Sequence, residues 1–328
     1  MNNMDNKKIK LNDKVIQSSI LIAAIFVSSS LGYTVGVRTA TRQKSNTIST
    51  EAKTPISDLE QKVLPSSGIT LPIVWGNLGT KLVSSGVLDA DKFKAIYEQK
   101  GQFTDEYNKL LTGENNGKLK ITNENSGYIL NLLWAFGLAN KNEILEKGEM
   151  TDSKYGGADK FASTGGWTIA KGSVMDHYSK HVMVTLTLEQ QALVDKVSRG
   201  IYRPCCGNST HFPDCNHGMA MLGFLELMAS QGVNEQDMWS AALTVNSYWF
   251  PDTYLTIATY MKDKGIDWKN VNPEEILGAT YSSSQGYVNI SSQVIKPEQQ
   301  QGGGSGCSLG GSGTSAVSSQ GQQTGCNL

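Results

Sequence analysis

The chain has 328 residues and a formal net charge of −1, from 29 Lys and Arg against 30 Asp and Glu. No run of basic residues interleaved with aromatic residues occurs in its middle, so we expect no nucleic-acid partner. A chain of this length can hold two domains, but both ends are poor in core-forming residues. We therefore expect one domain of moderate size between them.

The N-terminus predicts a membrane anchor. Residues 1–14 contain four lysines, and residues 15–37 contain no charged side chain. At 1.5 Å per residue, 15–37 is long enough to cross the hydrocarbon core as a helix, and the preceding lysines favour a cytoplasmic N-terminus. We expect a single-pass signal anchor with the rest of the chain extracytoplasmic, at the cell surface or in the periplasm. The alternative is a cleaved signal peptide, which also exports the domain.

Two polar segments flank the predicted domain. Residues 38–61 are rich in Thr, Ser and Lys without apolar periodicity, which predicts a tether between membrane and domain. Residues 297–328 are rich in Gly, Ser and Gln, a composition that cannot bury a core, and we expect a flexible tail that carries Cys307 and Cys326. The domain itself is expected over residues 62–296.

The apolar spacing within this domain is mostly helical. The segment from Pro72 to Gly86 is predicted as the first helix, and two more are predicted around 93–97 and 107–111. The segment 126–139 is apolar nearly all round, so we expect it to be the buried central helix. Only 118–122, with the sequence KLKIT, has the pattern of a strand.

The second half of the domain continues the helical pattern. Thr187 and Gln190 form a capping-box pattern for a helix that runs to Arg199. Further helices are predicted over 218–230, 234–250 and 252–264, and a short last one from Asn272 and Pro273. We therefore predict an all-α class with a single helical domain behind the transmembrane helix.

One segment lacks this periodicity. Residues 151–172 contain two Gly-Gly pairs and Trp167. A long irregular segment inside a compact domain is often functional. The alternative is a surface excursion without a function of its own.

All four histidines and three of the five cysteines lie between residues 176 and 218. His177 and His181 are four residues apart, so on a helix both imidazoles would project from one face within reach of a single ion. The Glu that zinc peptidases carry beside the first histidine is here Tyr178, so no metallopeptidase base is predicted.

The strongest candidate site is the stretch from Cys205 to His217. Cys205, Cys206, Cys215 and His217 offer three thiolates and one imidazole on a loop that ends at a predicted helix N-terminus. That set completes a tetrahedral zinc site, and with a methionine such as Met219 it would suit Cu⁺. The helix N-terminus would lower the thiol pKa values.

Two other interpretations use the same residues. Exported cysteines usually form disulfides, so Cys205 or Cys206 could bond to Cys215 and staple a surface interaction module that contacts another envelope protein. A cysteine activated by a histidine base would instead give a thiol-based redox or hydrolytic enzyme. No orienting group or oxyanion device is evident, so enzymatic activity is the less favoured interpretation.

Residues 202–249 resemble the exported bacterial proteins, many of them lipoproteins, that carry a PCYCGC motif. The likeness rests on a cysteine-rich motif, a following His and Cys, and a His-Gly pair that opens a helix, which are here 204–207, His211, Cys215 and 217–218. The alternating Cys-x-Cys-x-Cys of the family motif is absent from this chain. The resemblance implies an exported, membrane-attached module with a metal-binding or redox role.

These patterns together predict a membrane-anchored, extracytoplasmic protein that binds a transition metal ion. Zinc or copper is expected, with iron as a further candidate. Four residues are predicted as principal ligands and three as auxiliary ligands. The principal set is Cys205, Cys206, Cys215 and His217, and the auxiliary set is His177, His181 and His211.

Overall fold

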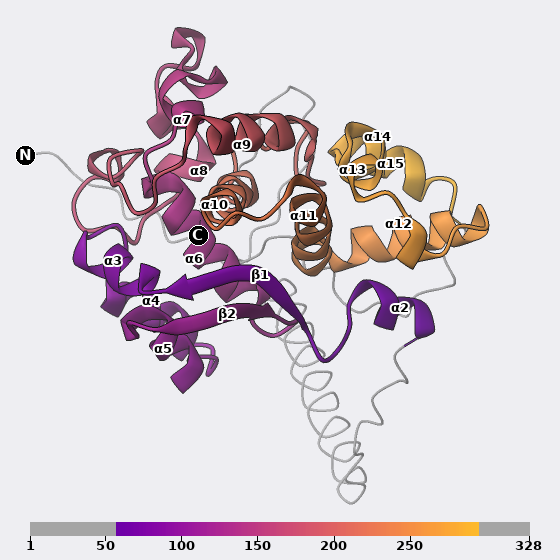
Figure 1. Ribbon diagram of the computed structural model, residues 1–328, viewed down its shortest axis with the longest axis horizontal. Coiled ribbons are helices and arrows are strands. Elements are labelled where there is room, and N and C mark those ends of the chain that lie inside the picture. The colour runs from indigo at the N-terminus through magenta and orange to yellow at the C-terminus, as the bar shows by residue number, and fades with distance from the viewer. Residues whose placement is uncertain (1–56, 295–328) are drawn as a thin grey trace, which may run out of the picture. The chain divides into compact units, whose positions relative to one another are not determined.

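The computed structural model describes residues 57–294, which are mostly helical, so the helical class is confirmed (Figure 1). A two-stranded sheet accompanies the helices. The predicted anchor over 15–37, nearly all of the tether and the tail with Cys307 and Cys326 lie outside the described residues. Within residues 57–294, none of the helices combines the length and the hydropathy that a membrane crossing requires.

The elements follow one another as α2 (Asp58–Val63), β1 (Ile69–Gly76), α3 (Leu78–Ser84), α4 (Ala90–Glu98), α5 (Asp105–Thr112), β2 (Asn116–Ile121), α6 (Ser126–Ala139), α7 (Glu143–Lys147), α8 (Ala162–Gly165), α9 (Leu188–Gly200), α10 (Asn216–Ser230), α11 (Glu235–Trp249), α12 (Pro251–Asp263), α13 (Pro273–Leu277), α14 (Ala279–Ser282) and α15 (Ser284–Ser291). Short 3₁₀ turns are η1 (Glu149–Thr151), η2 (Ser153–Tyr155), η3 (Ala158–Lys160), η4 (Val174–Asp176) and η5 (Trp268–Asn270).

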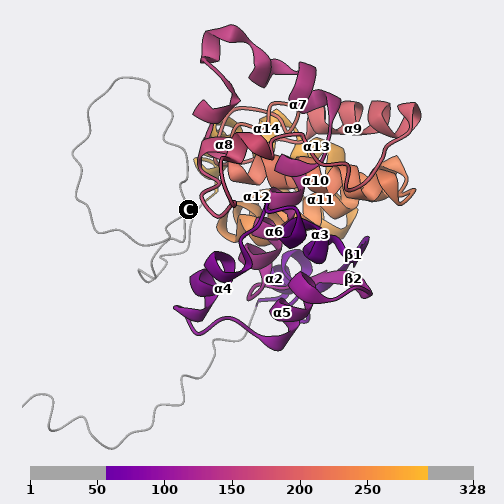
Figure 2. The same cartoon turned by 90° about the vertical axis from the view of Figure 1, so that its left-hand side faces the viewer.

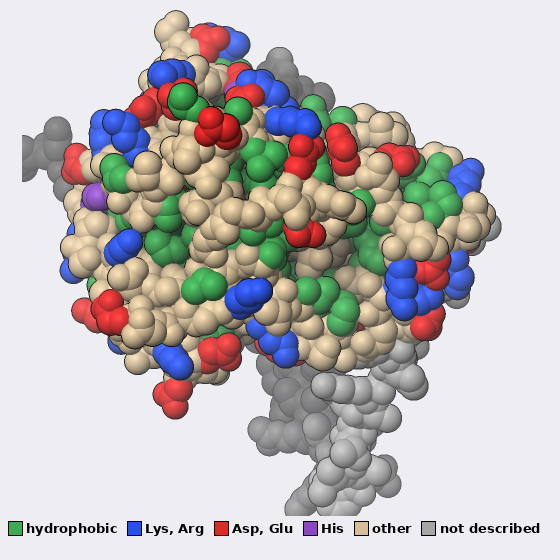
Figure 3. All heavy atoms as spheres, in the orientation of Figure 1, with side chains coloured by type: hydrophobic (Ala, Val, Ile, Leu, Met, Phe, Trp, Pro, Cys, Tyr) green, Lys and Arg blue, Asp and Glu red, His purple; other side chains and the backbone are tan. Residues whose placement is uncertain are grey.

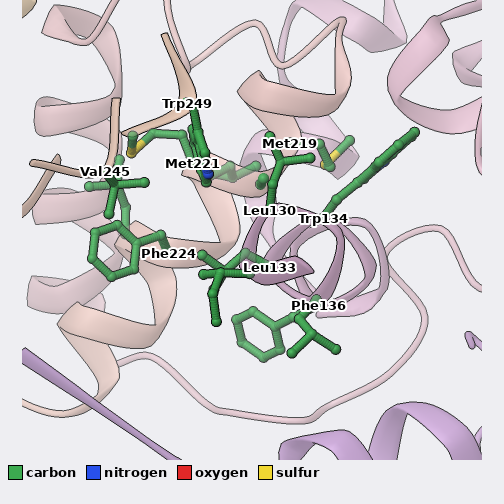
Figure 4. Close-up of a cluster of buried hydrophobic side chains, with 14 of the residues drawn as sticks. Leu130, Leu133, Trp134, Phe136, Met219, Met221, Phe224, Val245 and Trp249 are labelled. Atoms are coloured by element: carbon green, nitrogen blue, oxygen red, sulfur yellow. The ribbon is translucent and has the colours of Figure 1, made fainter. Parts of the chain in front are cut away.

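The core is built around α6 and α10, both of which are buried along nearly their whole length. The two helices touch at Gly137 and Gly223, where a methyl group on either glycine would overlap the backbone of the other helix. Side chains of α6, α10 and α11 join in one hydrophobic cluster beside this crossing (Figure 4). The sheet with α4 and α5 lies on one side of the pair, and α7, α8 and α9 lie on the other (Figures 1 and 2).

Most predicted helices are confirmed. The central helix has the bounds expected from its apolar run, and α4, α5 and α9 to α13 lie where the spacing places them. Thr187 and Gln190 form both bonds of the capping box at the start of α9. The first helix of the described residues, α2, begins at Asp58, four residues before the expected start of the domain at residue 62.

The prediction of one helix from Pro72 to Gly86 is wrong. Its first part belongs to strand β1, which pairs antiparallel with β2 from Ile69 opposite Ile121 to Gly76 opposite Asn116. The buried residues of β1 alternate along the strand with a period of two, and they are Leu71, Ile73 and Trp75. The helical prediction for this segment overlooked this period. Only the part from Leu78 onward is helical, as α3. The strand predicted at 118–122 is confirmed as β2.

The outer edge of β1 is covered by a side chain from the end of α10. The amide of Gln231 accepts a hydrogen bond from the Val74 N–H at 2.7 Å through Oε1 and donates one to the Val74 carbonyl at 2.8 Å through Nε2. Both backbone groups of Val74 are therefore satisfied, although its side chain is exposed.

The glycine-rich segment 151–172 packs against the core. Trp167 is buried, and its indole N–H donates to the Val87 carbonyl at 2.7 Å. Its ring meets that of Trp134 at 5.0 Å, and the Trp134 N–H in turn donates to the Ser163 carbonyl. At least this part of the segment is structural, which argues against the surface excursion.

Candidate metal centre

The three cysteines of the described residues lie on the connection between α9 and α10. Its backbone doubles back on itself, because Tyr202 bridges Ser209 and the Thr210 N–H donates to the Ile201 carbonyl at 2.7 Å. The Cys206 carbonyl also accepts from the N–H of Ser284 at the start of α15. These bonds fix the loop that presents Cys205 and Cys206 to the N-terminus of α10.

A buried arginine organises this loop. The guanidinium of Arg203 donates to the Cys215 Sγ at 3.0 Å, to the Asp214 Oδ1 at 2.5 Å and to the carbonyls of Asn208 and Phe212. Arg203 is only 1% exposed, so the ion pair with Asp214 lies almost out of water. Arg203 was not among the residues predicted for the site, and its position two residues before Cys205 is the only signal for it in the sequence.

Glycine is required beside this arginine. A Cβ on Gly218, early in α10, would lie 2.6 Å from the Cζ and Nη2 atoms of Arg203. The His-Gly pair at the helix start thus has a packing reason, because it leaves room for the guanidinium beneath the first turn.

Cys215 is the central sulfur of the cluster. It caps α10, since its Sγ accepts the Gly218 N–H at 3.4 Å, and it lies 3.5 Å from the Cys205 Sγ. That separation is much longer than the about 2.05 Å of a disulfide bond, and all three cysteines have free thiols. Cys215 is buried, whereas Cys205 is exposed.

The donor atoms around Cys215 fall into two groups, and within each group all donor atoms lie within 4.8 Å of one another. Cys205, Cys215 and His217 form one, and Cys206, Asp214 and Cys215 form the other. The four principal ligands expected from the sequence therefore gather around Cys215 but do not form a single compact set. Asp214 is a further donor that sequence reasoning did not select.

His217 contributes a buried nitrogen without a partner. The residue is 4% exposed, and its Nδ1 atom makes no hydrogen bond within the described residues. The ring packs against Phe250, with centroids 4.4 Å apart. A buried imidazole nitrogen left unpaired is a polar atom for which a ligand would compensate.

The three thiols do not ionise alike. The pKa of Cys215 lies well below its ordinary value of 9.0, because the Cys205 and Cys206 thiols contact its sulfur and Arg203 stabilises the thiolate. Contacts with the other two sulfurs raise the pKa of Cys205. For Cys206, contact with Cys205 lowers the pKa, but contact with Cys215 and burial outweigh it and raise the pKa to about 12. These shifts favour Cys215, the sulfur that accepts from Arg203, as the first of the three thiols to ionise.

His211, expected as an auxiliary ligand, lies apart from these groups. Its Nδ1 contacts Glu149 Oε2 at 2.7 Å and its Nε2 contacts Asp195 Oδ1 at 2.8 Å. Both ring nitrogens are thus occupied by carboxylates. The residue also lines a groove of about 800 Å³ between α7 and α9, which none of the described cysteines lines.

His177 and His181 also lie outside the cysteine groups, and they are not on a helix. The turn η4 ends at Asp176, and the chain from His177 to His181 bends through Ser179, which has a φ of 52°. The two rings nevertheless meet, with His177 Nδ1 3.0 Å from His181 Nε2. Burial lowers the pKa of His181, and the neighbouring His177 adds to this shift.

No family model, no curated protein and no solved structure matches the chain. The likeness of residues 202–249 to the PCYCGC-motif proteins stays a prediction. The chemistry of the centre is therefore inferred from its own donors. Two thiols with an imidazole suit Zn²⁺ or Cu⁺, and a carboxylate beside a thiolate is compatible with zinc or iron.

Proposed function

We propose that the protein is a membrane-anchored, extracytoplasmic metal-binding protein. Its centre consists of Cys205, Cys215 and His217, with Cys206 and Asp214 as neighbouring donors. The observation that carries the proposal is the unpartnered Nδ1 of buried His217, in a residue whose ligand atom lies within 4.8 Å of two thiol sulfurs. Zn²⁺ and Cu⁺ are the ions that this donor set favours.

Arg203 has a defined role in this proposal. Thiolate ligands bring negative charge into a site that is largely buried, and the guanidinium compensates it through the Cys215 sulfur and the Asp214 carboxylate. The exposed Cys205 places one donor at the surface, which supports exchange of the ion with a partner protein of the cell envelope.

A thiol-based redox function is the second candidate. Cys205 and Cys215 lie with their sulfurs 3.5 Å apart, and one of them has a lowered pKa, as in a nucleophilic thiol paired with a resolving thiol. His217 could act as a base in that chemistry, but one imidazole grouped with two sulfurs is a ligand set of the kind that Zn²⁺ and Cu⁺ favour, so we prefer the metal centre of the two.

Elemental analysis with thiol titration tests the proposal on the 328-residue chain, purified without a histidine tag. We expect about one Zn or Cu per chain, lost in the Cys215→Ser variant, with the thiols titratable after chelation. The matched control is Cys326→Ser, which removes a tail thiol that is not among the proposed ligands and should retain the metal. A metal-free protein in which Cys205 and Cys215 are oxidised to a disulfide would overturn the metal centre in favour of the redox function.

A further inference from the structure

The paired histidines form a structural unit of their own. His177 Nδ1 and His181 Nε2 face each other at 3.0 Å, and the rings lie nearly parallel, with an interplanar angle of 22°. Neither histidine belongs to the donor groups around Cys215.

The main chain that carries the two histidines is held by hydrogen bonds to the end of α6. The backbone N–H of His181 donates to the Ala139 carbonyl at 2.9 Å, and the His181 carbonyl accepts from the Lys141 N–H at 2.8 Å. These two bonds fix the His181 backbone to the end of α6. Between the histidines, the N–H of the buried Ser179 donates to the Leu138 carbonyl. The turn is therefore anchored at its left-handed residue, Ser179, and at His181 after it, and the two rings meet without a helix.

The tautomer of His177 follows from its partners. Its Nε2 lies 2.9 Å from the Lys171 carbonyl oxygen, which can only accept, so Nε2 carries the proton. The Nδ1 atom of the neutral ring then presents a lone pair towards His181. Histidines that bind metals commonly donate their second nitrogen to a backbone carbonyl in this way, which fixes the ring and leaves the other nitrogen free to coordinate.

We propose that His177 Nδ1 and His181 Nε2 form a second metal site, distinct from the cysteine centre, for a borderline divalent ion such as Ni²⁺ or Cu²⁺. On binding, the proton of His181 moves from Nε2 to Nδ1, so both facing nitrogens coordinate as neutral imidazoles. His181 is partly exposed, which gives the ion a route from solvent.

The separation of the two nitrogens favours this class of ion. At metal–nitrogen distances of about 2.0–2.1 Å, donors 3.0 Å apart subtend an angle of about 90° at the ion. That angle is close to the one between neighbouring ligands in the square-planar or tetragonal sites of Cu²⁺ and Ni²⁺, and narrower than the tetrahedral angle that structural zinc prefers. Water would complete the coordination.

Calorimetric titration with Ni²⁺ at neutral pH tests the site on the 328-residue chain without a histidine tag. We expect a binding event that the Cys215→Ser variant retains, because the histidine site does not depend on the cysteine centre. His177→Gln and His181→Gln should each weaken this event by about tenfold or more, since each removes one of two protein ligands. His211→Gln is the control and should leave it unchanged, because both His211 nitrogens already contact carboxylates.

A second measurement uses only the wild-type chain, so its outcome does not depend on whether a variant folds. Carbethoxylation of histidine followed by mass spectrometry should show that Ni²⁺ protects His177 and His181 and leaves the reactivity of His211 unchanged. Absence of Ni²⁺ binding in Cys215→Ser, undiminished binding in both histidine variants, or equal reactivity of His181 with and without Ni²⁺ would each overturn the site. None of these outcomes bears on whether the cysteine centre holds its own ion.

Discussion

The carboxyl group of Glu226 lies in the middle of α10 without any exposed surface. Its Oε2 accepts a hydrogen bond from the Asn140 amide at 2.6 Å, while its Oε1 has no partner within the described residues. Burial raises the pKa of Glu226 well above its usual value of 4.5, although the hydrogen bond from Asn140 opposes the shift. The folded protein therefore holds this carboxyl protonated over a pH range in which the unfolded chain ionises it.

This difference predicts a pH-dependent stability. Because the folded state binds the extra proton, the free energy of unfolding should fall as pH rises from about 4.5 towards the folded pKa, by up to about 1.4 kcal/mol per pH unit. Glu226→Gln should remove this slope and be more stable than wild type at pH 8. Urea unfolding at pH 5, 6.5 and 8 measures it, with Glu98→Gln, a change at an exposed carboxyl, as the control. A slope that persists in Glu226→Gln would assign the effect to another group.

At this scale the sequence predicted that Cys205, Cys206 and His217 gather around Cys215, but not the two donor groups they form or the residues that support them. Thiols and imidazoles are scarce in this chain, so their clustering within a short stretch is informative. The residues of that stretch are Cys205, Cys206, Cys215 and His217. Charged residues are common, and spacing alone does not say which of them turns inward, so Arg203 could not be distinguished from a surface arginine.

Among the elements, the crossing of α6 and α10 depends on two glycines. A Cβ on Gly223 would lie 2.7 Å from the Gly137 nitrogen and from the Leu133 carbonyl oxygen, both of them backbone atoms that cannot move without shifting α6. The helix axes can approach this closely only because neither residue has a side chain.

Gly223→Ala should therefore destabilise the protein. Alanine gains up to about 1 kcal/mol in helix propensity over glycine, but overpacking at a fixed contact costs about 1–3 kcal/mol, and we expect the clash to outweigh the propensity. Gly127→Ala in the first turn of α6 is the control, because a Cβ there meets nothing within 4 Å and should be neutral or stabilising. Equal unfolding midpoints in urea for Gly223→Ala and wild type would contradict the close crossing.

Elements were predictable where local pattern and tertiary environment agree. The capping box of α9 and the all-round apolar run of α6 are such cases, and both are observed. Strand β1 was missed because apolar residues of a strand followed directly by α3 also match helical spacing. The turn that joins His177 to His181 was missed because its shape comes from contacts with the end of α6, which are distant in sequence.

For the whole molecule, the cysteine loop links helices that are far apart in the chain. It connects α9 to α10 directly and reaches α15 through the hydrogen bond between Cys206 and Ser284. A ligand that binds only the folded loop stabilises the entire domain by mass action.

If the cysteine centre holds an ion as proposed, its removal should lower the thermal stability of the domain. At a free ion concentration about 1,000 times the Kd the stabilisation is about 4 kcal/mol, and each kcal/mol shifts the Tm of a domain of this size by about 2–4 °C. We expect scanning calorimetry to show a lower Tm after chelation, recovery on adding Zn²⁺, and no response in Cys215→Ser. A Tm that chelation leaves unchanged in wild type would place the ion outside the folded loop.

The distribution of charge on the surface and the predicted membrane location are also properties of the whole molecule. On the face shown in Figure 3, acidic and basic side chains are interspersed rather than gathered into a patch of one sign. The membrane anchor over 15–37 lies outside the described residues and stays a prediction of the sequence.

The contact between Gln231 and Val74 has an expected consequence for the protein at high concentration. An open strand edge is a template on which another chain can add a strand, and the exposed Val74 side chain would favour such self-association. Because the Gln231 amide occupies both backbone groups of Val74, an incoming strand would have to displace it at this point of the edge. A single amide thus discourages polymerisation along this edge of the sheet.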